Sequence, residues 1–148
     1  AGIATSQDLV HWVRHPHNPA LGPRQSGIWW DSGHVRGRSL TKIGDTYYAL
    51  YEGAAPSRNM HVPRWWDTIG LARSNDLIDW EYHPLDPIIP QQTGDRFDCM
   101  WTGWPRMWVE GDTVYLFYAA GGVSMETPYH HASTGLRTVS LERFLRWE

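Results

Sequence analysis

Short runs of β-branched and aromatic residues recur along the chain, separated by turn-forming residues. Gly44-Asp45 joins two such runs and favours a tight hairpin turn, and Asn75-Asp76 follows a third. Runs of this length and composition are typical of strands, not helices. The pattern predicts an antiparallel unit of four strands, at Val35–Ile43, Thr46–Tyr51, Thr68–Ser74 and around Trp80–Tyr82.

Two sequence elements occur twice in register. Gly2–Trp12 matches Gly70–Trp80 at an offset of 68 residues, with Gly, Ala, Ser, Asp, Leu and Trp in common. Gly44–Tyr51 matches Gly111–Tyr118 at an offset of 67. Agreement at so many fixed positions indicates tandem copies of one supersecondary unit.

Four strands per repeated unit favour a radial architecture over a sandwich. We therefore predict an all-β chain, 1–148, that forms part of a β-propeller built from four-stranded antiparallel blades. Residues 1–23 would be the end of a preceding blade, 28–90 one blade and 97–147 a second. Ser140–Trp147 is compatible with a short helix, but by analogy with residues 76–80 we predict an outer strand there.

Composition supports strands and excludes some functions. Ten Trp and seven Tyr accompany 14 Gly and 10 Pro, which suits short strands and many turns. With 13 basic and 16 acidic residues the chain has no excess of positive charge for a nucleic-acid partner. No apolar run approaches the roughly 20 residues that span a bilayer, so no membrane partner is expected either.

The sequence predicts neither a cofactor nor a metal site. Cys99 is the only cysteine, so no internal disulfide forms and a thiolate zinc site is not expected. His130 and His131 are adjacent and would point to opposite faces of a strand, so they would not bind one metal.

The repeated elements resemble those of a known superfamily. Ala4–Trp12, its copy Ala72–Trp80 and the run Gly44–Tyr51 resemble the five-bladed β-propeller glycoside hydrolases, a group with arabinanases and xylosidases, invertase-like fructosidases and mannoside phosphorylases. Gly135–Phe144 is similar to the closing strand of that group. The resemblance implies a sugar-holding funnel whose inner strands carry the catalytic carboxylates, and hence a carbohydrate ligand.

The chain departs from that group at one position. The relatives often carry Asp-Pro just inside the inner strand, where this chain has Gly37-Arg38 in one unit and Trp104-Pro105 in the other. Proline is kept once and the acid in neither unit. Two alternatives therefore stay open: a glycoside hydrolase-like protein, or a non-catalytic fragment that binds sugar or assembles with copies of itself through open blade edges.

Three other acids are candidates for catalysis, because glycoside cleavage needs two carboxyl groups beside the scissile bond. Asp31 and Asp98 lie at matching positions, each 13 residues before its Gly-Asp turn. Glu52 ends the strand that begins at Thr46. The alternatives are turn or cap residues for the two aspartates and an edge carboxylate in water for Glu52.

Basic and aromatic residues near the inner strands are the candidates for substrate binding. His34, Arg36 and Arg38 alternate, so they share one face of a strand, and Arg106 enters the corresponding strand of the second unit. Arginine on such a face can hold a carboxylate, a phosphate or sugar hydroxyls, or form salt bridges to Asp31 or Asp98. The aromatic candidates, for stacking on sugar or for packing between blades, are Trp29, Trp30, Trp101 and Trp104.

Overall fold

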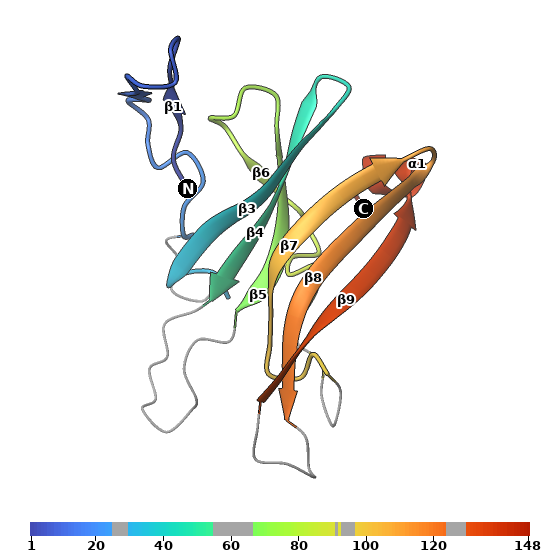
Figure 1. Ribbon diagram of the computed structural model, residues 1–148. Helices are drawn as coiled ribbons and strands as arrows, with labels where there is room; N and C mark the ends of the chain where they lie inside the picture. Colours follow the sequence, from blue (N-terminus) through green and yellow to red (C-terminus); the bar gives the residue numbers. More distant parts are fainter. Residues whose placement is uncertain (25–29, 55–66, 91, 93–96, 124–129) are drawn as a thin grey trace.

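The computed structural model describes residues 1–24, 30–54, 67–90, 92, 97–123 and 130–148. Nearly all of the regular structure is antiparallel β-sheet (Figure 1), as the sequence predicts. The elements are β1 (Ala4–Thr5), β2 (Val13–Arg14), β3 (His34–Ile43), β4 (Thr46–Ala54), β5 (Thr68–Ser74), β6 (Glu81–Tyr82), β7 (Trp101–Glu110), β8 (Thr113–Val123), β9 (His130–Ser140) and α1 (Leu141–Leu145).

The first large sheet has the strand order β3-β4-β5-β6. Its strands agree with the predicted ones, and β5 matches the predicted range residue for residue. Gly44 turns the chain between β3 and β4 with φ of +60°, a conformation that glycine adopts at little cost. A bulge between Gly37 and Ser39 interrupts the register of β3 with β4.

The second large sheet has the order β7-β8-β9. Gly111 forms the same kind of turn as Gly44, with φ of +54°. Again the first strand carries a bulge, here between Gly103 and Arg106. The described part of this sheet therefore has three strands, where the first sheet has four.

The N-terminal segment has the same hydrogen bonds as the last part of the first large sheet. Ile3 N donates to Asn18 Oδ1 at 2.7 Å, and Leu71 N donates to Asp86 Oδ1 at 2.9 Å. In the turns between these positions, the backbone N–H groups of Leu9 and Leu77 donate to the hydroxyls of Ser6 and Ser74. Residues 1–23 thus have the local structure expected for the end of a blade, although the blade boundaries themselves stay a prediction.

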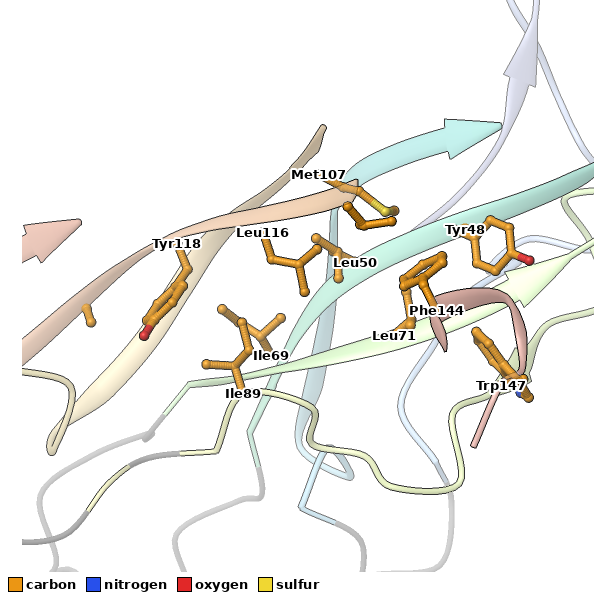
Figure 2. Packing of buried hydrophobic residues seen from close by; sticks show 12 residues of the cluster. Tyr48, Leu50, Ile69, Leu71, Ile89, Met107, Leu116, Tyr118, Phe144 and Trp147 are labelled. Carbon is orange, nitrogen blue, oxygen red and sulfur yellow. The ribbon is translucent and has the colours of Figure 1, made fainter. Parts of the chain in front are cut away.

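The main core lies between the two large sheets. Leu50, Ile69 and Leu71 from the first sheet pack with Met107 and Leu116 from the second, and Ile89 lies between them. Figure 2 shows these side chains in one layer, with Tyr48, Phe144 and Trp147 at one end. Burial of these apolar side chains, at about 25 cal/mol per Å² of area removed from water, holds the two sheets together.

The chain after β9 corrects one prediction. Residues 141–145 form helix α1, not the outer strand that we predicted for Ser140–Trp147. The Ser140 hydroxyl accepts a hydrogen bond from Arg143 N at 3.3 Å and caps the helix, and Phe144 and Trp147 pack against Tyr48 of the first sheet. In the described residues no helix is long and apolar enough to cross a membrane.

Part of the second sheet has an exposed apolar face. Phe117 and Leu136 are neighbours on β8 and β9, and both are exposed, as is Trp108 on β7. In the first sheet the position that corresponds to Phe117 is Leu50, which is fully buried. Association of copies through open blade edges stays a prediction.

Each large sheet also contains a cross-strand pair of tyrosine and glycine. Tyr51 pairs with Gly70, and Tyr118 pairs with Gly135. A Cβ atom at either glycine would lie 2.6 Å from the Cε1 atom of its tyrosine ring. The tyrosine ring therefore lies flat across the glycine, and a side chain there would displace it.

We expect Gly70→Ala to destabilise the protein by about 2–3 kcal/mol, because the new methyl group overlaps the Tyr51 ring. Chemical denaturation followed by fluorescence measures this loss. Gly22→Ala is the matched control, since its Cβ would meet Pro19 at an ordinary 3.5 Å, and it should change stability by less than about 0.5 kcal/mol. Equal effects of the two substitutions would contradict the tyrosine–glycine packing.

Candidate functional site

The first strands of the two sheets, β3 and β7, lie against one another. Arg106 Nη1 donates to Arg38 O at 2.7 Å, and Met107 N donates to Ser39 Oγ at 3.2 Å. Both contacts fall next to the bulges in these strands. The bulged parts of β3 and β7 therefore form one continuous region of polar backbone and side chains.

Glu52 is the buried centre of this region, with 1% of its surface exposed. It lies on β4, directly opposite Arg36 on the neighbouring strand β3. Arg38 on β3 approaches Glu52 Oε2 through Nε and Nη2, each at 2.6 Å. The backbone N–H of Trp104 on β7 donates to Glu52 Oε1. A buried carboxylate needs such partners to offset its lost hydration, and here they come from both sheets.

The bulge in β7 is shaped around this carboxylate. Trp104 has φ of +46°, an uncommon conformation for a residue with a bulky side chain. Gly103 precedes it, and a Cβ atom there would lie 2.8 Å from Glu52 Oε1. Glycine at 103 and the turned backbone at 104 thus let the Trp104 N–H reach Glu52, while the indole stays 56% exposed.

Asp67, directly before β5, is the second carboxylate of the region. His34 Nε2 lies 2.7 Å from Asp67 Oδ1. Arg36 Nη1 lies 3.6 Å from Asp67 Oδ2 and 3.9 Å from Glu52 Oε2. These two carboxylate oxygens are therefore at most about 7.5 Å apart, the sum of the two distances.

Two tryptophans flank the polar groups on β7. The rings of Trp101 and Trp104 meet edge to face with centroids 5.2 Å apart, and Trp104 is exposed to solvent. Trp30 instead stacks on Tyr51, with ring centroids 5.7 Å apart. It packs against a second, smaller apolar cluster formed by Leu21, Ala49, Tyr51 and Ala72. Trp29 lies outside the described residues.

Asp31 lies away from these groups in a separate buried network. It is fully buried, and Arg24 Nε contacts both of its oxygens at 2.9 and 2.8 Å. The Tyr51 hydroxyl lies 3.2 Å from Asp31 Oδ2 and 2.6 Å from Asp86 Oδ2. Asp31 thus ties residue 24 to the first sheet, and both of its oxygens have partners within the described residues.

Asp98 has the corresponding place in the second sheet. It is 2% exposed, and the Tyr118 hydroxyl donates to its Oδ2 at 3.4 Å. Arg137 Nη2 on β9 lies 3.9 Å from the same oxygen. The catalytic role predicted for Asp31 and Asp98 stays untested, but their burial and hydrogen bonding agree with a structural role.

Burial changes the proton affinity of the Asp31 network. It raises the pKa of Asp86 to about 6, although hydrogen bonds from Tyr51 and Leu71 N and the charge of Arg24 act in the opposite direction. Burial likewise raises the pKa of Tyr51, and the nearby Asp86 adds to this. Asp86 therefore exchanges its proton in the weakly acidic range.

The region around Glu52 can hold a polar ligand through guanidinium groups, an imidazole and an exposed indole. Its two carboxylates lie close enough for the separation of roughly 5–9.5 Å that glycosidases use. Among the described residues no group of three His, Cys, Asp or Glu side chains could hold a metal ion.

The sequence correctly grouped several of these residues. His34, Arg36 and Arg38 do lie together, and Arg106 and Glu52 join them. Their acidic partners differ from the predicted Asp31 and Asp98, because Arg38 pairs with Glu52 and Arg36 lies near Asp67. Asp67 was missed, since it lies outside the repeated elements. Asp31 and Asp98 are 67 residues apart, and so are Tyr51 and Tyr118. This equal offset could have predicted that each aspartate pairs with the tyrosine of its own unit.

No family model matches the sequence, and no curated protein matches it. Solved structures do match the fold. One described as "Glycoside hydrolase" superposes with a TM-score of 0.65 at 21% identity, covering 93% of this chain and 34% of that one. Another, described as a BT0996 RGII complex, has the same TM-score and coverage at 23% identity. The fold is that of β-propeller blades.

These matches confirm, for the fold, the resemblance to propeller glycoside hydrolases. A Bombyx mori GH32 beta-fructofuranosidase in complex with sucrose matches less well, with a TM-score of 0.48 at 21% identity over 68% of this chain and 19% of that one. The chain spans about a third of the length of the first two structures. At these identities the likeness extends to the fold and not to the activity.

The raised pKa of Asp86 predicts a pH dependence of stability. The folded protein holds this proton more tightly than the unfolded chain, whose aspartate has a pKa near 3.8. The contribution of Asp86 to stability is therefore fully present below about pH 4 and falls, by on the order of 3 kcal/mol, as the pH rises through about 6. Asp86→Asn should remove this fall in stability, because asparagine carries no titratable proton. Asparagine can also accept the backbone hydrogen bond, as Asn18 does at the equivalent position of the N-terminal segment.

Urea denaturation between pH 4 and 7 measures the effect. The exposed turn residue Asp79 provides the matched control, because Asp79→Asn should keep the wild-type pH dependence. The same slope in the wild type and in Asp86→Asn would show that Asp86 titrates normally.

Proposed function

We propose that the chain is part of a carbohydrate-active propeller of the glycoside hydrolase type, and that it binds an oligosaccharide over the bulged parts of β3 and β7. The single observation that carries this proposal is the meeting of Arg36, Glu52 and Asp67 beside the exposed ring of Trp104. The solved structures with the same fold support it, since one is described as a glycoside hydrolase.

The residues of the region suit a sugar. An exposed indole can stack on the apolar face of a sugar ring, and Trp101 holds the Trp104 ring from one edge. Arginine and histidine side chains can donate hydrogen bonds to hydroxyl oxygens around the ring. In this arrangement Trp104 supports the ring, while Arg36, Arg106 and His34 contact its polar edge; Arg38 acts through Glu52.

Glu52 and Asp67 are the candidate carboxylate pair for catalysis. The oxygens near Arg36 are at most about 7.5 Å apart, which is compatible with a retaining separation of about 5–5.5 Å or with the short end of the inverting range. Arg38 holds Glu52 in place at 2.6 Å, and we assign Glu52 the role of base or nucleophile. Asp67 is more accessible and would be the acid.

A non-catalytic sugar-binding protein is the second candidate. The observation that favours it is the saturation of Glu52 by Arg38 and by Trp104 N–H, which leaves few lone pairs for chemistry. In that case Glu52 only fixes the positions of Arg38 and of the β7 bulge. The two candidates share the ligand and differ in turnover.

Trp104→Ala should weaken sugar binding by at least roughly tenfold, because the stacking surface is lost. Titration calorimetry with arabino-, xylo-, fructo- and manno-oligosaccharides measures this. Trp12→Ala is the matched control, since Trp12 has the same exposed fraction of 56% and lies in the N-terminal segment. Absence of binding to any oligosaccharide, or equal binding by the two variants, would argue against the proposed site.

Turnover separates the two candidates. A catalytic pair predicts product release from a bound oligosaccharide and a loss of about a hundredfold or more in Asp67→Asn and Glu52→Gln. Asp45→Asn, in the exposed β3–β4 turn, should keep full activity. Because Glu52→Gln leaves Arg38 without its charged partner, its folding is checked by circular dichroism. Binding without any product in the wild type would favour the non-catalytic candidate.

A further inference from the structure

We propose that the site selects a sugar residue that carries a carboxylate group, a uronic acid or a similar acidic sugar. This inference rests on the proposed function and narrows its ligand. The guanidinium groups of Arg36 and Arg38 contact two carboxylates, Glu52 and Asp67, and the guanidinium of Arg106 bonds to the backbone of Arg38. Three guanidinium groups and two carboxylates leave one positive charge in excess, without counting His34.

Arg38 is committed within the protein, but Arg36 is not. Nη1 of Arg36 lies 3.6 and 3.9 Å from the two carboxylate oxygens, beyond the usual range of 2.7–3.2 Å for a hydrogen bond. Its side chain is 52% exposed. Arg36 thus feels the attraction of both carboxylates while its N–H groups remain available to a ligand.

Arg106 has donors available as well. Its Nη1 donates to two backbone carbonyls, Arg38 O at 2.7 Å and Pro105 O at 3.0 Å. These bonds fix the guanidinium at the junction of β3 and β7, and no carboxylate in the described part of the chain pairs with it. The junction therefore presents a fixed positive group at the solvent-exposed side of the site.

The ligand that best matches these groups is a monoanion with two coplanar oxygens. A guanidinium binds a carboxylate through two parallel hydrogen bonds, which a hydroxyl cannot reproduce. One carboxylate also balances the single excess charge, whereas a phosphate carries about −1.5 to −2 at neutral pH. With Trp104 supporting the ring, the arrangement favours an acidic sugar over a neutral one and over a free phosphate.

The test compares acidic oligosaccharides with uncharged copies of the same shape. A panel of oligogalacturonates and glucuronate-containing oligosaccharides is titrated beside their methyl esters, the neutral oligosaccharides named above and inorganic phosphate. We expect the free acids to bind about ten- to a hundredfold more tightly than their methyl esters, and the difference to shrink as salt is raised.

The variants assign this preference to Arg36. Arg36→Gln should bring acid and ester to equal affinity, and Arg36→Lys should retain only part of the difference because lysine lacks the planar pair of donors. Arg14→Gln, on exposed β2, is the control with the same change of charge and should keep the full preference.

The possible failures are distinguishable. Equal binding of acids and esters, binding of neutral sugars alone, or competition by phosphate at the same strength would overturn the acidic ligand and leave the sugar site in place. No binding by any sugar would overturn the proposed function, and the acidic ligand with it. Retention of the acid preference in Arg36→Gln would show that Arg36 does not bind the carboxylate of the sugar.

Discussion

The burial of one carboxylate, that of Glu52, constrains the junction of the two sheets. A charge removed from water must be fully hydrogen-bonded within the protein. Glu52 meets this need with Arg38 from β3 on one side and with the backbone of Trp104 from β7 on the other. The bulge in β7, the glycine at 103 and the positive φ of Trp104 all accommodate this contact. The same backbone turn leaves Trp104 exposed to solvent, where the proposed sugar would stack on its ring.

The apolar core supports this junction from behind. Leu50 and Leu71 pack against Met107 and Leu116, so the two sheets are held face to face independently of the charged groups. Helix α1 extends the same interface with Phe144. The apolar core includes neither Arg36 nor Arg106, and both of these side chains are exposed. A binding site is preorganised when its polar side chains are carried by strands that the core holds rigid, as β3 and β7 are here.

Much of the fold could be predicted from the sequence, because repeated turns and strands depend on local residues. Gly44 and the Asn75-Asp76 turn set the ends of strands within a few residues, and β5 was predicted without error. The C-terminal segment was predicted wrongly, since the analogy with residues 76–80 gave no weight to Ser140, whose side chain caps a helix. In the site, the strand alternation grouped His34, Arg36 and Arg38. Asp67 was not predicted, because it lies outside the repeated elements and meets Arg36 only in the folded sheet.

The contrast between Glu52 and Asp31 shows why residue type alone could not assign a role. Both are buried carboxylates paired with arginine, at 1% and 0% exposure. Asp31 is enclosed by Arg24 and Tyr51, and its neighbour Asp86 is partly buried. Beside Glu52, however, the side chains of Arg36 and Asp67 are partly exposed to solvent. The arginine beside Glu52 is the more exposed one, with 52% of the Arg36 side chain exposed against 17% for Arg24. This difference is why the proposed ligand site lies at the junction of β3 and β7 and not at the repeated aspartates.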